Sequence, residues 1–287
     1  MRLPWTKPAP PPAPAGANRL GEILADVDRV RPLPTSAVRV VQALDDPDSG
    51  ADQVAHLLRL DQALAADVLR LSNSASAAGV TRTASVQEAV TRLGFTRVKS
   101  LVLGAATATL LTRRLSGYGL SGQELWDHAV ITASLSRYVA ESTRYPDAEE
   151  AYVAGLLHDI GKLVLDQYVR AGHAVIIDLM RMKHCTLWQA EEQLFGMDHG
   201  AVGGLLAARW QFPLPLAEAI RCHHWPTLAR VRPELAAIVN IADALPARPP
   251  KLVATAAEPH PEALRLLHLD EAGLERLRAE MPWQPGL

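Results

Sequence analysis

The sequence predicts an all-α protein with a two-part helical architecture. From Leu20 onward, apolar residues recur mostly at helical spacing, and runs that alternate in the manner of a strand are scarce. Ala and Leu, which favour helices, are frequent. The chain has 287 residues, of which 48% are hydrophobic, so it can form one large or two small domains with a proper core.

The first part of the chain predicts six helices. A helix capped by Thr35 or Ser36 is followed by two short amphipathic helices that separate near Asp61. Longer helical patterns follow over 85–111, 121–142 and 147–169, and each begins after a plausible capping residue.

The second half contains shorter helical stretches, separated by Gly196, Pro213 and Pro215. They are "TLWQAEEQLFG", "DHGAVGGLLAARWQ", "PLPLAEAIRCHH" and "ELAAIVNIADAL". The segment "RRLSGYGLSG" is the predicted joint between the two parts. We expect a disordered Pro-rich leader at 1–18, an N-terminal helical subdomain at 19–115, a second helical core at 116–249 and a helical tail at 250–287.

Charge and cysteine content limit the classes of partner and compartment. The 29 basic and 31 acidic side chains nearly balance, so no overall field attracts nucleic acid or an anionic membrane. Two cysteines are too few for a disulfide framework and suit a reducing compartment. No stretch reaches the ~18 uninterrupted apolar residues of a membrane span. We expect a cytoplasmic protein that has no membrane partner.

The stretch "GLLHDIGKL" (155–163) raises the question of a metal site. Its apolar residues form one helical stripe, and His158, Asp159 and Lys162 fall outside that stripe. Taken alone, this pattern favours a polar flank that faces solvent.

Imidazoles and carboxylates in other segments favour a metal site instead. Glu124 and His128 are four residues apart and share one helical face. His199, the pair His223 and His224, and Asp243 each lie on other predicted helices, and Asp243 would be costly to bury unpaired. Taken alone, each of these residues is more often structural than a metal ligand. Together they form the mixture of ligands that suits Zn, Fe or Mn.

Two other kinds of site have weaker support. Cys222 adjoins His223, but no signature of a nucleophilic cysteine surrounds the pair. Arg92, Arg97 and Lys99 could contact DNA, although a solvated helix face is the commoner explanation of such a cluster.

The order of these residues resembles the HD superfamily of metal-dependent phosphohydrolases: His128, then His158 with Asp159, then Asp243. Several further fragments, over about residues 20 to 245, resemble the HDOD family of bacterial signalling proteins. They include "LPTSAVRVVQALDDP", "LLRLDQALAADVLRLSNSA", "SVQEAVTRLGFTRVKSLVL", "EEQLFGMDHGAVGGLLAARWQFP" and "AIRCHH".

The resemblance implies a set of site residues. HDOD domains are related to the HD-GYP phosphodiesterases, which degrade cyclic dinucleotides, and many HDOD members have lost metal ligands. By this resemblance the metal ligands are Glu124, His128, His158, Asp159, His199, His223, His224 and Asp243. One or two divalent ions would bind. Lys162 matches the lysine that contacts substrate phosphate, so Lys162 and Asp159 are the candidate catalytic residues.

The Gly-Tyr-Pro signature is absent, because "WPTLARVRPELAAI" follows the paired histidines. We therefore expect an HDOD regulatory protein that binds a signalling partner protein or a nucleotide ligand. The alternative is a metal-dependent phosphohydrolase acting on a nucleotide or a cyclic dinucleotide. In that case the metals would activate a water toward phosphorus, and Lys162 would balance charge on the phosphoryl oxygens.

Overall fold

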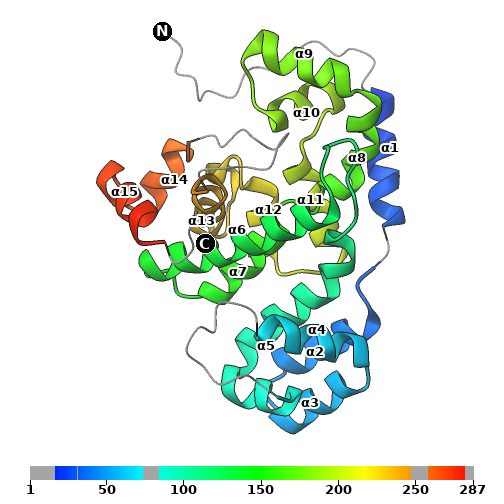
Figure 1. Cartoon of the computed structure of the whole chain (residues 1–287), viewed down its shortest axis with the longest axis vertical. Coiled ribbons are helices and arrows are strands. Elements are labelled where there is room, and N and C mark those ends of the chain that lie inside the picture. Colours follow the sequence, from blue (N-terminus) through cyan, green and yellow to red (C-terminus); the bar gives the residue numbers. More distant parts are fainter. Residues whose placement is uncertain (1–16, 31, 74–83, 247–257, 282–287) are drawn as a thin grey trace. The chain divides into compact units, whose positions relative to one another are not determined.

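The computed structural model describes residues 17–30, 32–73, 84–246 and 258–281. Within these ranges the regular elements are helices, and an isolated antiparallel bridge joins Leu115 to Leu120 (Figure 1). The all-α prediction is therefore confirmed. The chain divides into two compact units: Arg31–Leu111, and a larger unit that combines Met1–Val30 with Thr112–Leu287. Most of the predicted leader lies outside the described residues.

The smaller unit contains α2 (Thr35–Asp45), α3 (Ala51–Arg59), α4 (Gln62–Ser72) and α5 (Val86–Leu111). The first three helices pack against α5. The side chains buried between them are apolar and include Val40, Val54, Leu58, Val68 and Val102. Burial of these faces is the main source of this unit's stability.

The long helix α5 is interrupted, although the sequence predicts one continuous helix over 85–111. Gly94 has φ 76° and ψ 168°, a conformation that a residue with a Cβ rarely adopts. The sequence gives no sign of this break. Apolar residues at helical spacing continue on both sides of Gly94, and a single glycine inside such a pattern is compatible with a continuous helix.

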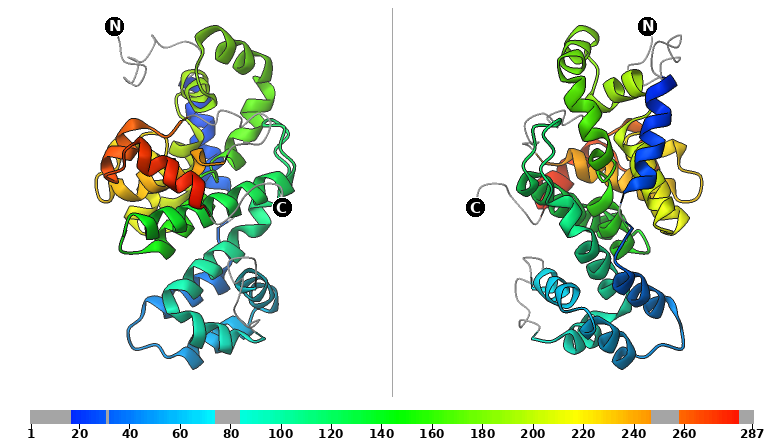
Figure 2. Two further views of the ribbon diagram at one scale, coloured as in Figure 1. Left: turned by 60° about the vertical axis from the view of Figure 1, so that its left-hand side comes forward. Right: turned by 90° about the vertical axis from the view of Figure 1, so that its right-hand side faces the viewer.

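In the larger unit, α6 (Gly122–Ser142) and α7 (Ala148–Leu157) make the most extensive helix pair, and they lie side by side in Figures 1 and 2. Gly155 permits this approach, because a Cβ there would lie 2.7 Å from the Thr132 carbonyl oxygen. α13 (Pro233–Ala244) packs on both helices, and α12 (Leu214–Cys222) packs on α7, α13 and α11 (His199–Arg209).

The remaining helices pack around α6, α7, α11, α12 and α13. α8 (Lys162–Ala171) packs on α11, and α10 (Leu187–Phe195) on α9 (His173–Lys183). α1 (Ala17–Arg29) contacts α8 and α11, and Asp26 of α1 accepts a hydrogen bond of 2.6 Å from Tyr168 of α8. α1 thus belongs to the larger unit, whereas the sequence assigns it to a subdomain spanning 19–115.

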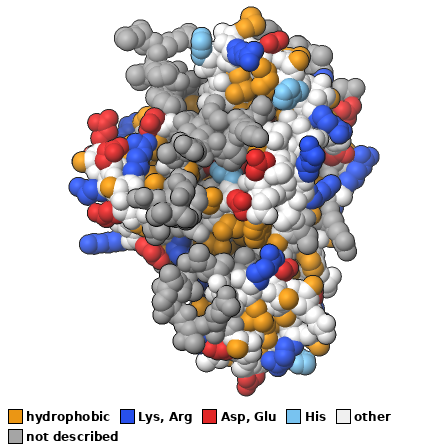
Figure 3. All heavy atoms as spheres, viewed as in Figure 1, with side chains coloured by type: hydrophobic (Ala, Val, Ile, Leu, Met, Phe, Trp, Pro, Cys, Tyr) orange, Lys and Arg blue, Asp and Glu red, His pale blue; other side chains and the backbone are white. Residues whose placement is uncertain are grey.

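The described part of the predicted tail, residues 258–281, packs within the larger unit. After the turn η2 (Pro226–Leu228), α14 (Pro261–Leu266) contacts α13, and the backbone N–H of His260 donates to Asn240 Oδ1 at 2.7 Å. Acidic and basic side chains are interspersed around α14 and α15 (Glu271–Glu280), as Figure 3 shows. Among the described helices, none is long and apolar enough to cross a membrane.

Candidate metal centre

All of the predicted ligands except Glu124 converge at one place in the larger unit. They come from the second turn of α6, the end of α7 and the turn after it, the start of α11, the end of α12 and the last turn of α13. These residues are His128, His158, Asp159, His199, His223, His224 and Asp243. Segments more than a hundred residues apart in the sequence therefore supply one cluster.

The first part of the cluster combines two imidazoles with two carboxylates. The Nε2 atoms of His128 and His158 are 3.2 Å apart. His128 Nε2 lies 3.3 Å from Asp159 Oδ2 and 3.2 Å from Asp243 Oδ1. Four donor atoms from three helical segments thus face a common point.

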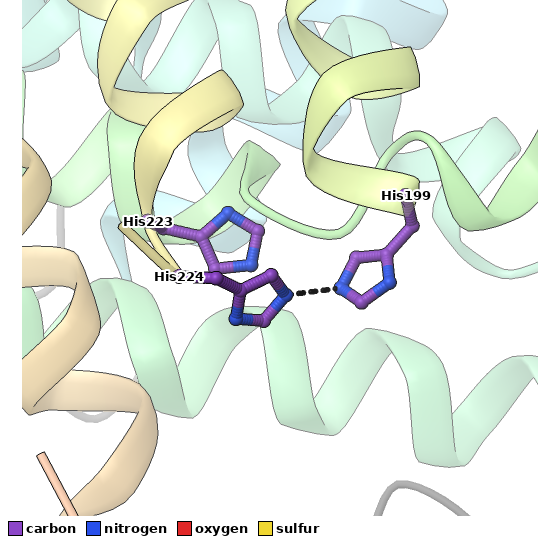
Figure 4. A group of neighbouring side chains, drawn as sticks. All are labelled: His199, His223 and His224. Carbon is purple, nitrogen blue, oxygen red and sulfur yellow. Dashed lines mark hydrogen bonds between the residues drawn. The ribbon is translucent and has the colours of Figure 1, made fainter. Parts of the chain in front are cut away.

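The second part consists of His199, His223 and His224, which Figure 4 shows gathered at the ends of α11 and α12. The Nε2 atoms of His199 and His224 are 2.9 Å apart. Asp159 joins the two parts, because its Oδ1 atom lies 3.2 Å from His199 Nε2 while Oδ2 faces His128. A carboxylate in this position can serve two neighbouring ions.

Backbone and side-chain acceptors fix the orientation of three rings. The Nδ1 atom of His158 lies 2.7 Å from the Gly155 carbonyl oxygen, and that of His223 lies 2.8 Å from the Ile220 carbonyl oxygen. His199 Nδ1 lies 2.7 Å from Glu191 Oε2. An Nδ1–H held in this way leaves Nε2 as the donor atom for a metal, which is the arrangement found around metal-binding histidines.

The donor set fits a divalent transition metal. His223 Nε2 is buried and has no hydrogen-bond partner among the described residues, which is costly without a ligand. Imidazole nitrogens with carboxylate oxygens suit Zn, Fe or Mn, and no thiolate is present in either group.

The local sequence explains how helix ends deliver these ligands. His158 and His223 are the C-terminal capping residues of α7 and α12, and His199 is the first residue of α11. Gly161 lets the turn after α7 touch α11, since a Cβ there would lie 2.6 Å from the Gly203 nitrogen and closer still to the His199 carbonyl oxygen.

Charge is distributed unevenly across the cluster. Burial by itself raises the pKa of Asp159, but His158, Lys162, His128 and His199 outweigh it and hold that pKa well below its usual range. Burial lowers the pKa of His128, yet hydrogen bonds to Asp159 and Asp243 raise it to about 9. Burial and its imidazole neighbours instead lower the pKa of His223 to about 3.

Lys162 is buried rather than directed at solvent. Its side chain is 2% exposed, and Nζ donates to Asp159 Oδ2 at 2.6 Å.

The most accessible acid of the cluster is Asp243, whose side chain is 30% exposed. The Trp188 ring stacks on His224, with centroids 5.1 Å apart and an angle of 13° between the planes.

Glu124 has a different position from the one expected. It is the third residue of α6, and its carboxylate accepts hydrogen bonds of 2.8 Å from both the backbone N–H and the hydroxyl of Ser121. The Ser121 hydroxyl in turn accepts from the Glu124 N–H, which completes a capping box.

Two residues near the cluster are absent from the sequence prediction. Glu191, fully buried on α10, accepts the His199 ring and backbone N–H groups, and the Tyr118 hydroxyl donates to it at 2.7 Å. For Glu191, the sequence offers one signal: in "QAEEQLF", one of the two adjacent glutamates must lie on the apolar face of the helix.

The other sequence hypotheses gain no support here. Cys222 is buried, and burial raises the pKa of its thiol to about 11, which disfavours the nucleophilic thiolate. Arg92 pairs with Glu88 at 2.7 Å, and Lys99 pairs with Asp45 at 2.6 Å. Two of the three cations of the proposed DNA-binding cluster therefore already have acidic partners.

A curated protein matches part of this chain. An uncharacterized protein of Treponema pallidum (strain Nichols) is 26% identical over 209 residues, which cover 72% of this chain and 40% of the relative. The chain therefore spans about two fifths of the length of this curated relative.

Two solved structures are similar over most of their length. An HDOD domain protein of unknown function from Geobacter sulfurreducens is 28% identical with a TM-score of 0.66, and the match covers 91% of this chain and 88% of that one. A protein of Shewanella amazonensis SB2B, provisionally named a phosphohydrolase, is 25% identical with a TM-score of 0.70, covering 91% and 94%.

The family model of the HDOD domain matches residues 30–226, which is well over half of the chain. This match, together with the helical fold shared with the Geobacter sulfurreducens protein, identifies the chain as a member of the HDOD domain family.

Proposed function

We propose that this protein is an HDOD regulatory module in which a divalent transition metal centre supports the binding of a partner protein or a nucleotide ligand. The observation that carries this proposal is the convergence of buried imidazoles whose Nδ1 atoms are already anchored, so that their Nε2 atoms face one another. His128, His158, Asp159 and Asp243 would hold one ion. His199, His223 and His224 would hold a second, with Asp159 shared.

The position of Lys162 favours a regulatory role over a catalytic one. A lysine that binds a substrate phosphate has to present its ammonium group to the substrate. Here that group is enclosed and neutralises Asp159. The absence of the Gly-Tyr-Pro signature points the same way, because the segment after His224 carries no such sequence.

A phosphohydrolase acting on a nucleotide or cyclic dinucleotide is the second candidate. It is favoured by the near-complete ligand set and by the partial exposure of Asp243, which gives the cluster one accessible side. A divalent ion supplies Lewis acidity for such chemistry. Asp159 would then orient the ions, and Lys162 would offset the charge of the bound phosphoryl group.

Metal content tests the shared premise. Protein purified without a histidine tag, after loading with Mn, Fe or Zn, is expected to hold at least about one ion per chain, and the His158→Ala/Asp159→Ala variant to hold none. The matched control, His56→Ala/Asp48→Ala, removes an exposed imidazole and an exposed carboxylate from the smaller unit and should retain the metal. A wild-type protein that holds no metal after loading contradicts the proposal.

Turnover separates the two candidates. The regulatory proposal predicts no release of product when the metal-loaded protein is incubated with nucleotides and cyclic dinucleotides. Robust hydrolysis that Asp159→Ala abolishes would establish the phosphohydrolase instead. Binding of the same nucleotides without turnover, measured by calorimetry, would identify a nucleotide as the ligand.

A further inference from the structure

A hydrogen-bonded chain leads from the metal centre to a loop that contributes no ligand. His199 Nδ1 lies 2.7 Å from Glu191 Oε2, and the other carboxylate oxygen accepts from the Tyr118 hydroxyl, also at 2.7 Å. Glu191 and Tyr118 are fully buried, and His199 is 3% exposed. The chain is therefore closed to water over its whole length.

Glu191 fixes both the ring and the backbone of His199. Besides the ring contact, Oε2 accepts the His199 backbone N–H at 2.9 Å. This N–H belongs to the first residue of α11, where helix amides have no partner within the helix. One carboxylate thus sets the position of the helix end and the rotation of the imidazole that the helix end carries.

Tyr118 is itself held in place by the backbone. The N–H groups of Gly117 and Tyr118 both point to Asp166 Oδ1, at 2.7 and 3.4 Å. Gly117 permits this contact, because a Cβ there would lie 2.7 Å from the Arg170 nitrogen and closer still to the Asp166 carbonyl oxygen. Asp166 and Lys162 lie on the same helix, and the Lys162 Nζ atom is 5.8 Å from the centre of the Tyr118 ring.

A purely structural role would not require this polar arrangement. A buried carboxylate is costly, and a hydrophobic side chain could fill the same space. The carboxylate is explained if it is needed to accept Nδ1–H, because that bond leaves the lone pair of Nε2 for an ion and makes the ring a stronger donor. Tyr118 then supplies the second hydrogen bond that keeps the carboxylate from rotating.

We propose that Glu191 and Tyr118 are positioning residues of the metal centre, which hold His199 Nε2 toward the ion through the chain Tyr118–Glu191–His199. This inference rests on the proposed metal binding and assigns two residues to it. Neither residue touches the ion, so their effect is on metal affinity and on the orientation of the ring.

Zinc affinity, measured by competition with a chromophoric chelator, tests the inference. Glu191→Leu removes the acceptor and should weaken zinc binding by about 10- to 100-fold, the usual effect of losing such a partner. Glu191→Gln should lose much less, because its amide oxygen can accept from His199 while its NH₂ group donates to the Tyr118 hydroxyl. Tyr118→Phe should fall between them. Tyr145→Phe is the matched control, since its hydroxyl also donates to a glutamate, Glu150, at 3.0 Å but contacts no predicted ligand.

Ring ¹⁵N spectra of the zinc-loaded protein give a second readout that general loss of stability would not move. The His199 ring should carry its proton on Nδ1 in the wild type and in Glu191→Gln, and should lose this fixed tautomer in Glu191→Leu. If Glu191→Leu does not fold, Tyr118→Phe and Glu191→Gln still decide. Wild-type zinc affinity in a folded Tyr118→Phe overturns the inference. A wild-type protein that binds no zinc instead contradicts the proposed function itself.

Discussion

Two Lys–Asp ion pairs of the same length lie in very different surroundings. In the larger unit Lys162 Nζ is 2.6 Å from Asp159, and the two side chains are 2% and 1% exposed. In the smaller unit Lys99 Nζ is also 2.6 Å from Asp45, but these side chains are 24% and 57% exposed. Equal distances therefore do not imply equal energies, because water screens the second pair and not the first.

The same contrast separates the two units as a whole. Among the described residues, every buried side chain that carries an ionisable carboxylate, amine or imidazole belongs to the larger unit. Buried polar side chains of the smaller unit are the hydroxyls of Ser49, Ser100 and Thr107. Burying charges is unfavourable for stability unless they are paired, so their concentration in one unit indicates a functional site there.

The largest expected effect comes from breaking the buried pair. Asp159→Asn leaves Lys162 enclosed without its counter-charge, which should lower the free energy of unfolding of the metal-free protein by about 3 kcal/mol. It also removes the carboxylate shared by both groups of histidines, so zinc affinity should fall by at least about 100-fold. Urea unfolding and chelator competition measure the two effects. A loss confined to metal affinity would show that water reaches Lys162 and relieves the unpaired charge.

A comparable effect on stability, without any effect on metal affinity, should come from the apolar core of the smaller unit. Leu58 is fully buried, and Leu58→Ala should cost about 2 to 5 kcal/mol of stability because it removes apolar contacts and leaves a cavity. Metal stoichiometry should not change. Leu60→Ala is the control, since Leu60 is 63% exposed and its truncation should have little effect on the urea midpoint. Metal loss in Leu58→Ala would show that the two units depend on each other.

The smallest effect should come from the exposed pair. Asp45→Asn should change the free energy of unfolding by less than about 1 kcal/mol, and the difference should shrink further as salt is added. Urea unfolding at low and high salt measures it. A cost comparable to that of Asp159→Asn would remove the contrast between the two pairs.

The sequence predicts most of the fold, because amphipathic periodicity and helix breakers are local signals. Helices separated near Asp61, and the breaks at Gly196 and Pro213, are found where the sequence places them. Pro215, expected as a breaker, instead lies in the first turn of α12, where a proline is tolerated. The sequence pattern does not show the break at Gly94 or the break at 158–161 between α7 and α8, because apolar residues at helical spacing continue on both sides of each. The membership of α1 depends on contacts such as Asp26 with Tyr168, 142 residues away, which no local pattern encodes.

Prediction of the candidate site from the sequence has the same limits. His158 and Asp159 look like a solvated flank until the other helices are considered, since only tertiary packing buries them. Glu124 and His128 have the spacing of a ligand pair, yet Ser121 and Glu124 also match a capping box, and the capping interaction is the one formed. Glu191 is one of two adjacent acids in "QAEEQLF", and no local pattern shows that this acid contacts both His199 and Tyr118, the latter 73 residues earlier.

The delivery of ligands by helix ends has a consequence for how the chain opens. An ion that joins His128 to Asp243 would close a loop of 115 residues (243 − 128), and a tie across so long a loop removes much of the freedom of the unfolded chain. The ion would act as a reversible cross-link whose strength depends on its free concentration. Exchange of amide hydrogens throughout α7, α11 and α12 would then slow together as metal is added, as if three helices had become a single cooperative segment.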